Sequence, residues 1–60
     1  QSAHLKVLIA QLPIADQRLI NMYLDGFSTE EIGHIMDISQ SNVTTRIGRI
    51  KEKLRKLNNI

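Results

Sequence analysis

Residues 29–50, with the sequence TEEIGHIMDISQSNVTTRIGRI, contain two amphipathic stretches separated by a turn at residues 37–39. The first stretch, residues 29–36, is about two helical turns long. Apolar residues recur at spacings that let two helices pack at a steep angle. They are Ile32, Met36, Ile38, Val43 and Ile47. The segment therefore predicts a helix-turn-helix.

Single residues in and beside this segment have the properties that such a motif needs. Gly33 lacks a side chain where the second helix should cross closely. Asp37 occupies a turn position where glycine is commonest, and Asp tolerates left-handed backbone. Ser28 followed by Glu31 matches a capping box, and Ser39 is a good N-cap for the next helix. Both helices of the motif thus have defined starts.

Two further helices are expected before the motif. The first covers roughly residues 3–12 and stops before Pro13, because the residue preceding proline disfavours helix. The second runs from Pro13 or Ile14 to Asp25, and Gly26 follows where a left-handed residue ends a helix. The residues expected to face the core are Leu5, Leu8, Ile9 and Leu12 in the first helix, Leu19, Ile20, Tyr23 and Leu24 in the second, and Ile32, Ile35 and Met36 in the third.

The last helix is expected to be long and amphipathic. Its apolar residues alternate at spacings of four and three. They are Val43, Ile47, Ile50, Leu54 and Leu57. No repeat or linker interrupts the 60 residues, so we predict one all-α domain at residues 1–60, with four helices, a helix-turn-helix and a long C-terminal recognition helix.

Composition narrows the class of protein. Cysteine is absent, which excludes disulfides and thiolate zinc sites. There is no apolar run of about 18 residues or more that would predict a membrane span, so we expect a soluble, intracellular protein without a membrane partner. Gln1 is an unusual natural start and suggests a piece of a longer chain.

No catalytic, cofactor or metal site is predicted. His4 and His34 are far apart and have no cysteine or clustered carboxylate beside them. Glu30 and Glu31 lie at a helix start, where dipole and capping effects explain them. The chain offers neither a nucleophile with a base nor a phosphate-binding glycine loop, so we expect a binding module and not an enzyme.

The distribution of charge points to a polyanionic partner. Eight basic and six acidic residues give a net charge of +2, and five of the acids lie before residue 38. Residues 46–56 contain six basic residues and one acid. This asymmetry indicates an end of the molecule that faces nucleic acid.

The face of the last helix opposite Val43 is small and polar. At about 100° per residue it carries Ser41, Thr45, Gly48 and Glu52. Asn42, Thr44 and Arg49 lie on its shoulders. Short hydroxyl and amide side chains can enter a groove and contact base edges. Arg46 and Arg49 are the first candidates for phosphate contacts, and the amides of the helix capped by Ser28 could add another.

The chain resembles region four, the C-terminal promoter-binding domain, of bacterial sigma factors of the extracytoplasmic-function (ECF) type. The likeness covers residues 12–57. It is carried by LP at 12–13, YLDGFS at 23–28, EEI at 30–32, DIS at 37–39, SNV at 41–43, RI at 46–47 and RIKEKL at 49–54. Thr44 and Gly48 depart from frequent family forms, in which Lys or Arg and a larger side chain are common.

This resemblance implies that the last helix enters the major groove of the promoter's minus-thirty-five element and supports transcription initiation. It further implies that the domain binds the beta-subunit flap of RNA polymerase core. The expected location is the bacterial cytoplasm, at the nucleoid, and an anti-sigma protein is a possible further partner. With the helix start at Ser28 and Thr29 included, the predicted DNA-binding residues are Ser28, Thr29, Gln40, Ser41, Asn42, Thr44, Thr45, Arg46, Gly48 and Arg49.

Two alternatives share parts of the pattern. The DNA-binding output domain of a two-component response regulator (LuxR-like) has a similar four-helix arrangement and a similar segment at residues 26–32. A helical interaction or dimerisation module without DNA binding would also explain the apolar stripe from Val43 to Leu57. The Leu-Pro pair at residues 12–13 and the basic residues 49–56 favour the sigma factor.

Overall fold

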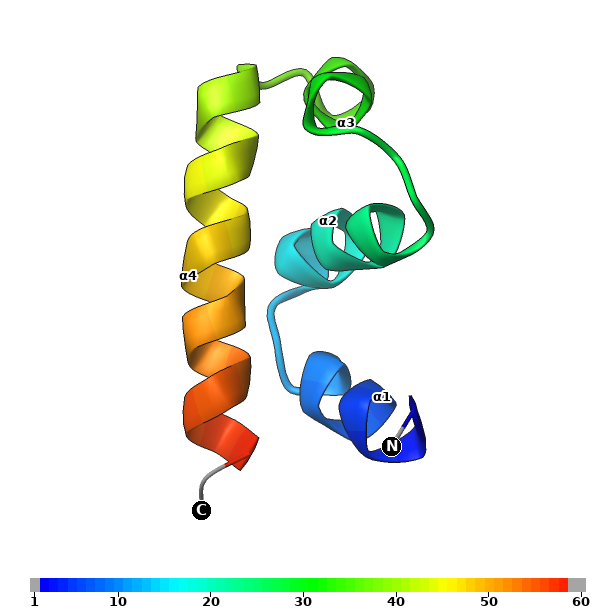
Figure 1. Cartoon of the computed structure of the whole chain (residues 1–60), viewed down its shortest axis with the longest axis vertical. Coiled ribbons are helices and arrows are strands. Elements are labelled where there is room, and N and C mark those ends of the chain that lie inside the picture. The colour runs from blue at the N-terminus through cyan, green and yellow to red at the C-terminus, as the bar shows by residue number, and fades with distance from the viewer. Residues whose placement is uncertain (1, 59–60) are drawn as a thin grey trace.

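The computed structural model describes residues 2–58 and contains four helices in this part of the chain. They are α1 (Ser2–Ala10), α2 (Ile14–Leu24), α3 (Thr29–Met36) and α4 (Gln40–Asn58). The three shorter helices follow one another along one side of α4, with α3 at its N-terminal end and α1 at its C-terminal end (Figure 1). The predicted all-α fold with a long last helix is confirmed.

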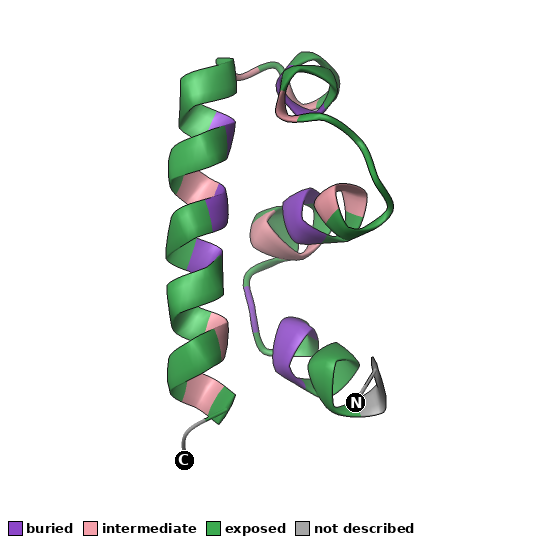
Figure 2. Ribbon diagram, viewed as in Figure 1, coloured by how far each residue is buried: buried purple, intermediate pink, exposed green. Residues whose placement is uncertain are grey.

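The core lies between α4 and the three shorter helices. The side of α4 that faces them is buried in the N-terminal half and partly buried further on, and the opposite side is exposed along its length (Figure 2). Val43, Ile32 and Leu19 have no exposed surface, and burying an aliphatic side chain of this size stabilises the fold by about 1.5–3 kcal/mol. The other buried apolar residues described are Leu8, Ile9, Leu12, Ile20, Ile47 and Ile50.

Three residues expected in the core are instead exposed, and the predictions for them were wrong. The exposed fractions are 36% for Leu5, 53% for Leu24 and 57% for Ile35. The cause is the single layer of helices along α4, which covers only a narrow stripe of each short helix. In α3 that stripe contains Ile32 and the half-buried Met36, and Ile35 falls beside it.

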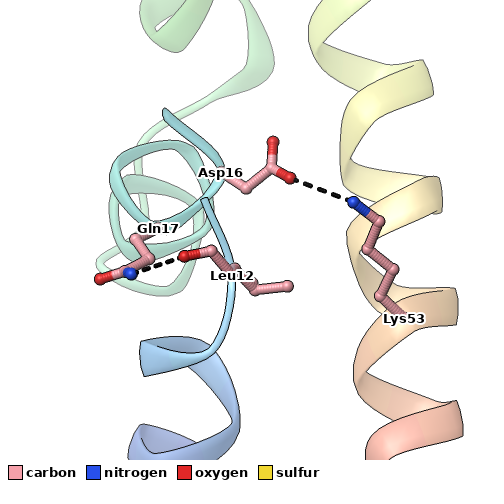
Figure 3. Close-up of polar contacts among 4 residues, drawn as sticks. All are labelled: Leu12, Asp16, Gln17 and Lys53. Carbon is pink, nitrogen blue, oxygen red and sulfur yellow. Dashed lines mark hydrogen bonds and ion pairs between the residues drawn. The ribbon is translucent and has the colours of Figure 1, made fainter. Parts of the chain in front are cut away.

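The link between α1 and α2 depends on a side chain that the sequence pattern did not indicate. Helix α1 ends at Ala10, two residues earlier than expected, and Leu12 is buried in the link that follows. The Gln17 amide nitrogen donates to the Leu12 carbonyl oxygen at 2.7 Å (Figure 3). It also donates to the Ala10 carbonyl oxygen at 3.3 Å. Gln17 thereby satisfies carbonyl groups that the end of a helix leaves without partners.

The turn between α2 and α3 is as predicted, because Gly26 has a φ of +100°. Within residues 2–58, no helix has the length and apolar character needed to cross a membrane.

Candidate nucleic-acid interface

The turn and caps of the helix-turn-helix have the predicted geometry. Ser28 Oγ accepts from the Glu31 N–H at 3.0 Å, and the Ser28 N–H donates to Glu31 Oε1 at 2.8 Å, which completes the capping box. Asp37 adopts left-handed backbone with φ 60° and ψ 44°. Ser39 Oγ accepts from the Asn42 N–H at 3.1 Å and caps α4. The capping box marks where α3 begins, the left-handed Asp37 marks where it ends, and the Ser39 cap marks where α4 begins.

The close approach of the two helices occurs at Gly33, as the sequence suggested. A Cβ atom at this position would lie 2.7 Å from the carbonyl oxygen of Ile38 and 3.4 Å from a methyl group of Val43. The obstruction is thus mainly the backbone of the turn. Gly33 therefore helps to set the angle at which α4 leaves the motif.

The N-terminal half of α4 presents a polar surface that no other helix covers. It consists of Gln40, Ser41, Asn42, Thr44, Thr45, Gly48 and Arg49, all of which are exposed. Arg46, at its edge, is half-buried. Nothing lies within 4 Å of the position that a Cβ on Gly48 would take. The predicted exposure of this face is confirmed, and its small side chains leave the helix backbone accessible to a partner.

Several polar side chains at the start of α4 are held by internal hydrogen bonds. The Gln40 amide nitrogen donates to Thr29 Oγ1 at 2.9 Å and links the first residues of α4 and α3. Thr44 Oγ1 donates to the Gln40 carbonyl oxygen at 3.1 Å. Among the described residues, the side chains of Asn42 and Thr45 have no hydrogen-bond partner. These two side chains are therefore free to form hydrogen bonds with a binding partner.

Basic residues of α4 continue the polar surface towards α2. Arg46, Arg49, Ile50 and Lys53 of α4 line a shallow hollow together with Pro13 and Asp16 at the start of α2. Lys53 Nζ lies 3.6 Å from Asp16 Oδ2 (Figure 3). No local pattern in the sequence indicates this pair, because the two residues lie far apart along the chain.

Two other cations of α4 also have partners within the domain. Lys51 Nζ lies 5.2 Å from the centre of the Tyr23 ring, a cation–π contact. Arg55 pairs with Glu52 one turn before it. Of the basic residues in residues 46–56, Arg46 and Arg49 line the hollow and have no acidic partner among the described residues.

The start of α3 is the remaining part of the predicted interface. The capping box already uses the N–H groups of Ser28 and Glu31. The backbone N–H groups of Thr29 and Glu30 have no partner within residues 2–58. The carboxylates of Glu30 and Glu31 lie in the same turn. A phosphate bound at these amides would therefore lie close to two negative charges.

The described residues include no group of three or more His, Cys, Asp or Glu side chains that could hold a metal ion. His4 instead lies near the C-terminal end of α4, with Nε2 at 2.8 Å from Asn58 Oδ1.

Comparison with known proteins agrees with the geometry. The model of the family described as "Sigma-70, region 4" matches residues 3–54, a span that includes α2, α3 and most of α4. No curated protein and no solved structure gives a match. The family match favours the sigma factor over the response-regulator and interaction-module alternatives. The chain therefore belongs to the sigma-70 region 4 family, the part of sigma factors that binds the minus-thirty-five element of promoter DNA.

Proposed function

We propose that this domain recognises its promoter element with the polar face of α4 lying in the major groove, as part of a sigma factor of the ECF type. The observation that carries the proposal is the uncovered surface formed by residues 40–49. A helix fits the major groove of B-form DNA, where each base pair presents a distinct pattern of donors and acceptors. The resemblance stated above supports the ECF type.

The residues of this surface divide by chemistry into two groups. Hydroxyl and amide side chains face outward from the first two turns of α4 and suit base edges. They are Gln40, Ser41, Asn42, Thr44 and Thr45. Arg46 and Arg49 lie beside them and suit phosphates. Gly48 lets α4 approach the floor of the groove closely. The free backbone amides at the start of α3, at Thr29 beside Ser28, suit a further phosphate.

The wider context of the domain follows from its family. A region 4 domain acts on RNA polymerase, and we place the contact at the beta-subunit flap. The chain then forms one domain of a longer sigma factor in the bacterial cytoplasm, at the nucleoid, and an anti-sigma protein is a further candidate partner. The role is recognition of DNA, with no catalysis by the domain itself.

A binding experiment with matched variants tests the assignment of residues. The chain is titrated with a set of duplexes that carry every single-base change in the best-bound promoter element. Thr45→Ala should change which duplexes are preferred, because a good base contact contributes about 1–3 kcal/mol of discrimination. Arg46→Ala and Arg49→Ala should weaken binding to all duplexes alike.

Arg18→Ala is the matched control, since it removes the same charge from an exposed position on α2. It should leave affinity close to that of the unchanged chain. Equal losses for Arg18→Ala and Arg49→Ala would mean that only net charge matters. If Thr45→Ala and Arg46→Ala lose affinity in the same pattern across the duplexes, the division into base and phosphate contacts is contradicted.

A further inference from the structure

The hydrogen bond between Thr29 and Gln40 connects the two helices of the motif at the edge of the proposed interface. Gln40 is the first residue of α4, and its amide nitrogen lies 2.9 Å from Thr29 Oγ1. Thr29 is half-buried in the first turn of α3, whereas Gln40 is exposed. One end of the bond is therefore held by the fold and the other lies at the surface.

This bond restricts a side chain that would otherwise sample many rotamers. Fixing a Gln side chain costs conformational entropy, because the side chain has many rotamers to lose. If the side chain is already oriented in the free protein, less of this cost falls on DNA binding. The Thr29 hydroxyl occupies one N–H of the Gln40 amide, and the second N–H and Oε1 remain available.

We propose that Thr29 is a positioning residue for Gln40 and that the oriented Gln40 carboxamide recognises an adenine in the promoter element. A Gln side chain contacts adenine through two atoms, with one N–H donating to N7 and Oε1 accepting from the N6 amino group. Those are the two groups that Thr29 leaves free. The inference rests on the proposed placement of α4 in the major groove.

The bond contributes little to holding the helices together. It is exposed to solvent, and a hydrogen bond of this kind has a small net effect on stability. The angle between α3 and α4 depends instead on the buried contacts around Gly33 and Val43. Loss of the Thr29 hydroxyl should therefore change the orientation of Gln40 and leave the fold in place.

The test compares Thr29→Val, which removes the hydroxyl and keeps the branched shape, with Thr29→Ser, which keeps the hydroxyl. Both retain the backbone N–H proposed to meet a phosphate. Binding is measured on duplexes in which each base pair of the best-bound element is replaced in turn, and thermal unfolding of each variant is recorded. Gln40→Ala identifies the base pair that Gln40 recognises.

We expect Gln40→Ala to reduce the preference for one adenine-containing base pair by about fivefold to 100-fold. Thr29→Val should reduce the preference at the same base pair, and Thr29→Ser should keep it within about twofold. Thr29→Val should add no further loss when Gln40 is already Ala, because the two residues act as one unit. The unfolding temperatures of the Thr29 variants should stay close to that of the unchanged chain.

Three results would overturn the inference. They are unchanged base preference in Thr29→Val, an equal loss on every duplex, and a loss in Gln40→Ala at a pair without adenine. Failure of the proposed function looks different, because the unchanged chain would then bind all duplexes alike or none. If the unchanged chain prefers its promoter element and Thr29→Val keeps the same base preference, the proposed function stands and Thr29 has no positioning role.

Discussion

Gly33 and Gly48 lie in the two helices of the same motif, and their surroundings are opposite. A Cβ at Gly33 would meet the Ile38 carbonyl oxygen at 2.7 Å, whereas a Cβ at Gly48 would meet nothing within 4 Å. The sequence indicated a special role for both positions. Only the folded structure distinguishes the two positions, because the obstruction at Gly33 comes from the backbone of the turn that follows it.

This difference predicts opposite effects of the same substitution. Gly33→Ala should destabilise the domain by about 1–3 kcal/mol, since the added methyl group overpacks a rigid contact. Gly48→Ala should stabilise it by up to about 1 kcal/mol, because Ala is the better helix former. Thermal or denaturant unfolding followed by circular dichroism measures both. A stability loss in Gly48→Ala, or none in Gly33→Ala, would show that the surroundings of the two glycines are wrongly assigned.

Asp37 provides a second test at the residue scale. Its left-handed backbone, with φ 60°, is strained for a side chain and free of strain for glycine. We expect Asp37→Gly to stabilise the domain by about 0.5–1 kcal/mol, because the relief of backbone strain exceeds the cost of the freedom that glycine adds to the unfolded chain. This gain raises the unfolding temperature by several degrees in a domain of this size.

Asp25→Gly is the control for Asp37→Gly, because Asp25 ends α2 with an ordinary φ of −76°. It should bring no gain, since glycine there only adds freedom to the unfolded chain. The same gain in both variants would exclude relief of backbone strain as the cause.

At the scale of elements, the start of α2 and the middle of α4 form one charged surface. Asp16 is the acid in the first turn of α2, and it lies 3.6 Å from Lys53 of α4. Its carboxylate faces the same hollow as Arg46 and Arg49. A DNA phosphate that approaches this hollow would therefore compete with Asp16 for Lys53.

Removing that carboxylate should strengthen DNA binding. We expect Asp16→Asn to raise affinity for all duplexes alike and to steepen the dependence of log affinity on log salt concentration by about one unit, because Lys53 becomes free for a phosphate. Asp25→Asn removes the same charge from the end of α2 and should have the smaller effect. Fluorescence anisotropy at several salt concentrations distinguishes the two variants, and identical slopes would argue against a specific role for Asp16.

The elements themselves could be predicted well, and their edges less so. The capping box at Ser28 and the left-handed residues at Gly26 and Asp37 fixed the boundaries of α3, because each depends on a few neighbouring residues. Leu24 and Ile35 were placed in the core by helical spacing alone. Spacing says which residues share a face, but the width of the covered stripe depends on the neighbouring helix.

For the whole molecule, the order of helices and the exposed polar face of α4 followed from the sequence, whereas the contacts between distant residues did not. The Asp16–Lys53 pair and the bond between Thr29 and Gln40 join side chains from different helices. Such contacts depend on how the helices are placed in space, which periodicity along one helix does not determine.

For the molecule to recognise a promoter as proposed, the uncovered face of residues 40–49 must bind double-stranded DNA. Nuclear magnetic resonance titration of the isotopically labelled chain with a duplex containing the minus-thirty-five element, at low ionic strength, tests it residue by residue. We predict that the backbone amide signals of residues 40–49 and of the start of α3 shift, and that those of α1 stay in place. An unchanged spectrum, or shifts confined to α1 and the C-terminal end of α4, would contradict the claim.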